Sequence, residues 1–130
     1  MPGLTGGGSL VRFVARGDDL LDAAKYADDI VDMAGTMNSN RWLGKAMHDG
    51  YMDFASGEMF RTNTSLRKIF EGVDSLLRPD AVDVTNKILY ELKPCNTKSF
   101  LNALKQTNRY LETIGDNKRV WTVVIDLYLK

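Results

Sequence analysis

The sequence predicts a single α/β domain of the α+β type, with a mixed central β-sheet flanked by helices and preceded by an N-terminal helical segment. Three observations predict it: two β-favouring runs around a short turn, an amphipathic helix directly after them, and an apolar strand after that helix. The chain of 130 residues is long enough for one stable core. Hydrophobic residues at 44% and charged residues at 26% are ordinary globular values, which excludes a wholly disordered chain.

Composition also excludes several classes of function. The single cysteine, Cys95, excludes an intramolecular disulfide and any multi-cysteine zinc site. No apolar run approaches the roughly 20 residues of a membrane span, and residues 1–8 lack the basic start and apolar stretch of a signal peptide. The net charge is zero, but residues 1–65 carry 6 Lys/Arg against 9 Asp/Glu, and residues 66–130 carry 11 against 8. The second half is therefore the better candidate for contact with nucleic acid.

The first half of the chain is predicted to be mainly helical. Residues 1–17 begin with a Gly-rich stretch and are expected to form a flexible leader, so that residues 18–130 form the single domain. Apolar residues at helical spacing predict a helix over residues 18–34, whose six aspartates indicate a solvated acidic face. A second helix is expected over residues 41–55. Residues 58–78 show no clear pattern beyond a helical turn near 65–70.

The second half is predicted to contain the sheet. Residues 81–84 and 88–93 favour strands and surround a three-residue turn, which indicates a hairpin. An amphipathic helix follows from about Ser99 to Ile114, capped by Thr97 or Ser99 and ended by Gly115. Residues 120–125 form an apolar strand of the kind that is buried on both faces. This order predicts a mixed sheet with a helical crossover.

Three charged residues of the hairpin carry the candidate chemistry. Glu91 and Lys93 share one strand face because side chains alternate, and the turn returns Asp80 beside them. Two neighbouring carboxylates repel, and a divalent cation relieves that conflict; oxygen ligands favour Mg²⁺ or Mn²⁺ over Zn²⁺. Lys93 would then orient the attacking water or stabilise the charge that develops on a phosphate. The alternative is a solvated Glu-Lys pair on an edge strand, with Asp80 as a turn residue after Pro79.

These residues also resemble a known signature. Pro79-Asp80 followed by Glu91-Leu92-Lys93 resembles the PD-(D/E)xK motif of the restriction-endonuclease-like nucleases. The wider pattern, Arg-Pro-Asp-x-x-Asp and then Ile-x-Tyr-Glu-Leu-Lys-Pro, resembles the restriction-endonuclease-fold toxin domains at the C-termini of bacterial polymorphic toxins, such as Rhs and contact-dependent-inhibition effectors. The resemblance covers about residues 41–125. It implies metal-dependent phosphodiester hydrolysis, with Asp80 and Glu91 as metal ligands and Lys93 as the catalytic lysine.

Further site candidates come from the same resemblance. Gln106 and Tyr110, which share one helix face, have counterparts in part of the superfamily, where they would contact phosphate or position the lysine; a polar stripe beside the core is the alternative. A Gly-Lys-x-x-His stretch in related toxin domains is matched at residues 44–48, so His48 is a candidate for proton transfer or phosphate contact, or else a surface residue. Additional acidic candidates are Asp49, Asp53, Glu58 and Asp83, the last of which would need a β-bulge to reach the metal.

The resemblance also implies partners. The substrate would be nucleic acid, with DNA favoured and RNA, such as transfer RNA, as the alternative. A carrier protein would deliver the domain from the producing bacterium into the cytoplasm of a target cell, and a cognate immunity protein would block the site. The other interpretations are a non-catalytic binding module of the same fold and an immunity or scaffold protein. The basic residues expected to form a rim around the site are Lys98, Lys105, Arg109, Lys118 and Arg119.

Overall fold

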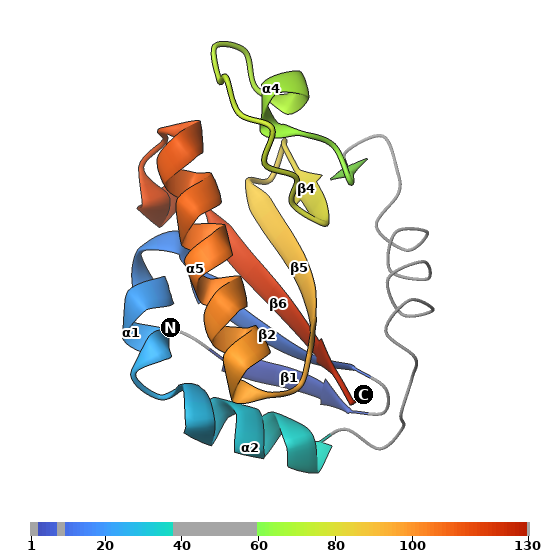
Figure 1. Ribbon diagram of the computed structural model, residues 1–130. Helices are drawn as coiled ribbons and strands as arrows, with labels where there is room; N and C mark the ends of the chain where they lie inside the picture. The colour runs from blue at the N-terminus through green and yellow to red at the C-terminus, as the bar shows by residue number, and fades with distance from the viewer. Residues whose placement is uncertain (1–2, 8–9, 38–59, 130) are drawn as a thin grey trace.

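The computed structural model describes residues 3–7, 10–37 and 60–129 (Figure 1). The predicted helix over residues 41–55 lies outside the described residues. In chain order the described elements are β1 (Gly3–Gly7), β2 (Leu10–Arg16), the 3₁₀ turn η1 (Gly17–Asp19), α1 (Leu20–Ala24), α2 (Ala27–Met37), β3 (Phe60–Thr62), α4 (Leu66–Ile69), β4 (Ala81–Asp83), β5 (Ile88–Pro94), α5 (Thr97–Ile114), the 3₁₀ turn η2 (Lys118–Val120) and β6 (Thr122–Tyr128).

The strands form one six-stranded mixed sheet in the order β1-β2-β6-β5-β4-β3. β5 and β6 are parallel and are joined by α5, whereas every other neighbouring pair is antiparallel. In Figure 1 α5 lies across the face of the sheet, with α1 and α2 beside it. The α+β class and the helical crossover are therefore confirmed. No helix in the described parts of the chain is long and apolar enough to cross a membrane.

The prediction of a flexible leader over residues 1–17 is wrong. Residues 3–7 and 10–16 are strands, and β2 pairs with β6 along its whole length, from Leu10 opposite Tyr128 to Arg16 opposite Thr122. Val11, Phe13 and Ala15 are buried in the main core. Their alternation with less buried neighbours is the period-two pattern of a half-buried strand, which the preceding glycines obscured.

The helix predicted over residues 18–34 is instead two short helices. α1 ends in a tight turn, in which Lys25 N donates to Asp22 O at 3.2 Å and Tyr26 N donates to Ala23 O at 3.1 Å. The chain then restarts as α2. One side of both helices is buried in the core, at Leu20, Ala23, Ala27, Val31 and Ala34. The acidic residues of this segment are mostly exposed, as the sequence predicts.

The predicted hairpin and the long helix are confirmed with small changes. Ala81 lies opposite Tyr90 in the antiparallel β4–β5 pair. α5 is capped by Asn96, whose side chain accepts a hydrogen bond from Ser99 N at 2.8 Å, so the predicted caps are wrong. Thr97 instead donates to Asp28 Oδ1 at 2.7 Å and joins α5 to α2. Gly115 ends the helix with a φ of 85°, in the left-handed region that glycine adopts without strain.

Asp83 stabilises the turn of the hairpin. Its carboxylate accepts hydrogen bonds from Asn86 N at 3.0 Å and from Asn86 Nδ2 at 2.8 Å, and the residue is buried. We expect Asp83→Ala to lower the free energy of unfolding by about 1–3 kcal/mol, because the Asn86 donors lose their partner. Urea denaturation measures this change. The activity of the folded fraction should stay at the wild-type level, and a large loss of that activity would make Asp83 a metal ligand after all.

Candidate active site

The two predicted carboxylates lie side by side, joined by reciprocal hydrogen bonds to the backbone. Asp80 directly precedes β4, and Glu91 lies in the middle of β5. Asp80 N donates to Glu91 Oε1 at 3.1 Å, and Leu92 N donates to Asp80 Oδ2 at 2.8 Å. The Glu91 carboxylate is therefore held by the backbone of Asp80, and the Asp80 carboxylate by the backbone of the residue after Glu91. The hairpin brings the two acids together as the spacing predicts.

Lys93 completes the cluster. It lies two residues after Glu91 on β5 and therefore projects from the same face of the sheet. Its Nζ is 3.8 Å from Glu91 Oε2, and its side chain is 24% exposed, against 3% for that of Glu91. The ammonium thus reaches the recessed carboxylate from the solvent side. The alternative of a fully solvated Glu-Lys pair does not hold, because Glu91 is buried and Lys93 is only partly exposed.

Helix α5 contributes Tyr110 to this cluster. The buried hydroxyl of Tyr110 donates to the backbone carbonyl of Arg78 at 3.3 Å and also forms a hydrogen bond with the Glu91 carboxylate. Burial, together with the charges of Glu91 and Asp80, raises the pKa of Tyr110, so the phenol stays protonated and acts as a donor. Gln106, one helical turn earlier, is exposed. The structure therefore brings Tyr110, but not Gln106, into contact with the carboxylates.

The electrostatics of the cluster favour a bound cation. Burial of Glu91, followed by the negative charge of Asp80, raises the pKa of Glu91 from 4.5 to about 8, although Asp80 N, Lys93 and Tyr110 act in the opposite direction. Without a bound cation, Glu91 is therefore harder to ionise than an ordinary glutamate. A positive ion between the carboxylates would remove this conflict and favour ionisation of both acids.

The donor set fits Mg²⁺ or Mn²⁺. In the described ranges 3–7, 10–37 and 60–129, no group of three or more His, Cys, Asp or Glu side chains is placed to hold a metal. Asp80 and Glu91 supply two carboxylates, and Mg²⁺ is commonly held by one or two carboxylates together with water and substrate phosphate oxygens. His48, Asp49, Asp53 and Glu58 lie outside the described residues. The two carboxylates found here match the protein part of such a donor set.

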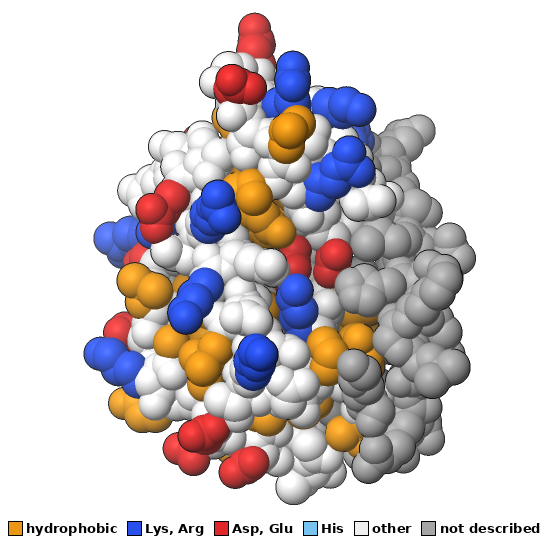
Figure 2. Space-filling view, in the orientation of Figure 1, with side chains coloured by type: hydrophobic (Ala, Val, Ile, Leu, Met, Phe, Trp, Pro, Cys, Tyr) orange, Lys and Arg blue, Asp and Glu red, His pale blue; other side chains and the backbone are white. Residues whose placement is uncertain are grey.

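On the face shown in Figure 2, Lys and Arg side chains gather over α5 and over the α4 region. Lys98, Lys105 and Arg109 of α5 are exposed. The other two residues expected in the basic rim are engaged with acids elsewhere: Lys118 Nζ lies 3.4 Å from Glu112 Oε1, and Arg119 Nε lies 3.7 Å from Asp18 Oδ2. The rim predicted from the sequence is thus reduced to its α5 members.

Sequence reasoning missed a residue that fixes Asp80. Asn63 N donates to Asp80 O at 3.1 Å, and Asn63 has a φ of 46°, in the left-handed region that asparagine tolerates better than most residues. It directly follows β3, in a stretch for which the sequence shows no clear pattern. No motif marks Asn63, because its contact is made by the backbone and depends on the pairing of β3 with β4.

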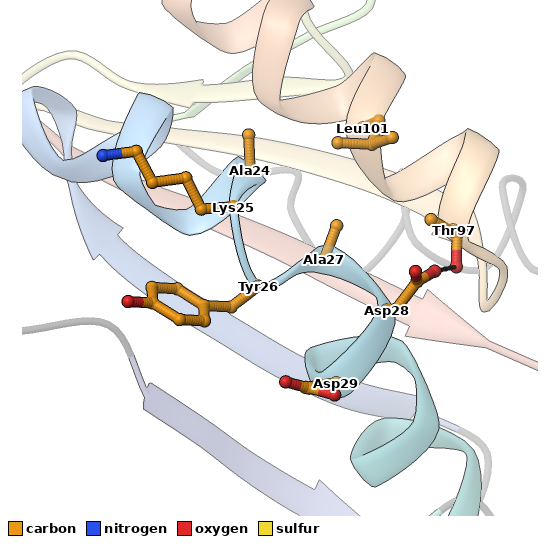
Figure 3. A pocket seen from close by; sticks show the side chains of 8 residues that line it. All are labelled: Ala24, Lys25, Tyr26, Ala27, Asp28, Asp29, Thr97 and Leu101. Atoms are coloured by element: carbon orange, nitrogen blue, oxygen red, sulfur yellow. Dashed lines mark hydrogen bonds between the residues drawn. The ribbon is translucent and has the colours of Figure 1, made fainter.

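An open pocket of about 260 Å³ lies apart from the carboxylates, between the α1–α2 turn and the start of α5 (Figure 3). Residues 24–29 line it together with Thr97 and Leu101. Asp28 faces Thr97 across the pocket and accepts its hydrogen bond, whereas Lys25 and Tyr26 point away from α5. The polar groups of this pocket thus connect two helices, and their arrangement does not resemble the acid–lysine cluster on β5.

Comparison with known proteins gives one match. The profile of a family described as restriction endonuclease fold toxin 9 matches residues 36–128, a range that includes Asp80, Glu91 and Lys93. No curated protein and no solved structure matches the chain. The matched region begins near the end of α2, so the β1–β2 hairpin lies outside it.

Proposed function

This chain belongs to the restriction endonuclease fold toxins, and from that membership and the geometry of its site we propose that it is a metal-dependent nuclease that hydrolyses phosphodiester bonds. The observation that carries the proposal is the convergence of Asp80, Glu91 and Lys93: two carboxylates joined by reciprocal backbone hydrogen bonds, with an ammonium 3.8 Å from one of them. A structural ion pair needs only one acid, so the second carboxylate supports a hydrolytic site.

In this proposal Asp80 and Glu91 hold Mg²⁺ or Mn²⁺. The bound ion would polarise the phosphodiester and offset the charge that develops during hydrolysis. Asp80 is held by hydrogen bonds from Leu92 N to its carboxylate and from Asn63 N to its carbonyl. Glu91 is held by Asp80 N and Tyr110. Because both acids are fixed before the substrate arrives, the site needs little reorganisation when it binds.

Lys93 would act on the reacting groups directly. Its ammonium lies at the solvent side of the carboxylates, where a substrate phosphate would enter. From there it can stabilise the negative charge of the transition state or orient the attacking water. Tyr110 is a positioning residue in this account, because its hydroxyl contacts Glu91 and the backbone two residues before Asp80.

The biological setting follows from the toxin family. We propose that a carrier protein delivers this domain into the cytoplasm of a target bacterium, where it cuts DNA. A nuclease of this kind would damage its producer, so a cognate immunity protein is expected to block the site. The exposed basic side chains of α5 would favour an immunity protein with an acidic surface, because complementary charges promote association.

An assay on two substrates tests the proposed function. Purified chain with Mg²⁺ is incubated in parallel with plasmid DNA and with total RNA, and the products are separated on gels. We expect cleavage of the plasmid that Mn²⁺ also supports and that EDTA abolishes. Cleavage of RNA alone would identify RNA as the substrate and would still support metal-dependent phosphodiester hydrolysis. Undiminished cleavage in EDTA, or no cleavage of either nucleic acid, would overturn the proposal.

A further inference from the structure

We propose that residues 61–78, called here the basic arm, form a second phosphate-binding wall, so that the nucleic-acid backbone is held on both sides of the carboxylates. This inference rests on the proposed nuclease function and adds a binding surface that the sequence pattern does not mark. The arm runs from β3 through α4 to Arg78, which lies two residues before Asp80. α5 forms the wall on the other side.

The arm is attached to the site by its backbone. At one end Asn63 N donates to Asp80 O at 3.1 Å; at the other, the carbonyl of Arg78 accepts from Tyr110 at 3.3 Å. Within the arm, Leu66 N donates to Leu77 O at 2.9 Å, and the Leu66 side chain is fully buried. The backbone that carries the cationic side chains of this arm is therefore held at a fixed place relative to Asp80.

The charges of the arm are available for a ligand. Arg67, Lys68 and Arg78 are exposed, and none of them forms an ion pair with a described acidic residue. Lys25 and Lys87 behave differently, because they pair with Asp22 and Asp116, at 3.6 and 3.2 Å. A polyanionic substrate is repelled by the two carboxylates. Cations that have no acidic partner can offset this repulsion by binding the substrate phosphates.

The two walls lie on opposite sides of the acids. Tyr110 contacts Glu91 from the α5 side, while Asn63 contacts Asp80 from the arm side. In Figure 2, acidic side chains lie between the basic groups over α5 and those over α4. The arm also carries Glu71 and Asp74, which follow α4 in the exposed turn, beyond Arg67 and Lys68. A phosphate backbone crossing the carboxylates would meet cations before and after the scissile bond.

The test compares two double variants. Binding of a fluorescent DNA duplex is measured as a function of salt in the Lys93→Met background, and kcat and KM for plasmid cleavage are measured without that change. Loss of two phosphate contacts in Arg67→Ala/Lys68→Ala should flatten the slope of log K against log salt by about 1.8 and weaken binding roughly tenfold. KM should rise with kcat nearly unchanged, and Arg67→Lys/Lys68→Arg should restore the wild-type slope.

The matched control is Arg16→Ala/Lys25→Ala, which also removes one arginine and one lysine, each exposed and paired with aspartates of residues 18–22. It should leave slope and KM unchanged. If the wild type cleaves DNA but the arm variant behaves like this control, the inference about the arm is wrong and the nuclease function stands. If the wild type neither binds nor cleaves nucleic acid, the proposed function is wrong, and so is the inference about the basic arm.

Discussion

Replacement of Lys93 with methionine is expected to reduce the rate of phosphodiester cleavage by about 10²–10⁴-fold. Methionine keeps the length and much of the apolar stem of lysine, so the fold should be retained while the ammonium is lost. That ammonium is 3.8 Å from Glu91 Oε2. The effect should appear in kcat, measured from initial rates of plasmid nicking with Mg²⁺ at saturating substrate.

Lys87→Met is the matched control for this change. Lys87 directly precedes β5, six residues before Lys93, and its Nζ pairs with Asp116 Oδ2 at 3.2 Å. Strand geometry places the two Cα atoms roughly 20 Å apart, so the control variant should cleave at the wild-type rate. If both variants unfold at the wild-type temperature and have equal activity, Lys93 takes no part in the cleavage reaction.

The second large effect concerns stability and pH. The folded-state pKa of Glu91, about 8, lies above its ordinary value of 4.5, so folding favours the protonated form. Its contribution to the free energy of unfolding is fully present below about pH 4.5 and is lost as the pH rises through 8. Without metal, Glu91→Gln should therefore stabilise the protein at about pH 9, by on the order of 3 kcal/mol or roughly 10 °C in Tm.

The change in Tm on adding Mg²⁺ tests the same role of Glu91, this time with the metal present. In the wild type at about pH 9, saturating Mg²⁺ should raise Tm, because an ion that binds only the folded state stabilises it by mass action. Glu91→Gln should lose most of this response. The control is Glu112→Gln, because the Glu112 side chain is 61% exposed and pairs with Lys118 on the surface; its Tm should follow the wild type with and without Mg²⁺. A wild-type Tm that changes with neither pH nor Mg²⁺ would contradict the assignment of Glu91 as a metal ligand with a raised pKa.

The hairpin that brings Asp80 beside Glu91 could be predicted because its determinants are local. Alternation along residues 88–93 fixes which side chains share a face, and a short turn fixes the position of Asp80 opposite Glu91. The same is true of α5, where the error concerns only the cap: three capping residues, Asn96, Thr97 and Ser99, compete within four positions. The choice of Asn96 becomes clear only when Thr97 is seen to bond Asp28 of α2.

The missed elements depend on distant partners. β2 is a strand because β6 pairs with it, and more than one hundred residues separate Val11 from its partner Leu127. β3 has only three residues and exists through its pairing with β4, so the position of Asn63 beside Asp80 leaves no local signal. The break between α1 and α2 falls at Lys25 and Tyr26, where neither proline nor glycine marks the end of a helix.

The most direct test of the account is the position of a bound divalent ion. Crystals of the protein soaked in Mn²⁺ should show one anomalous peak between the Asp80 and Glu91 carboxylates, within about 2.0–2.6 Å of an oxygen of each. Crystals of Glu91→Gln should lose that peak. A peak that lies elsewhere in the wild type, or one that persists unchanged in the variant, would contradict the claim that these two acids form the metal centre of a nuclease.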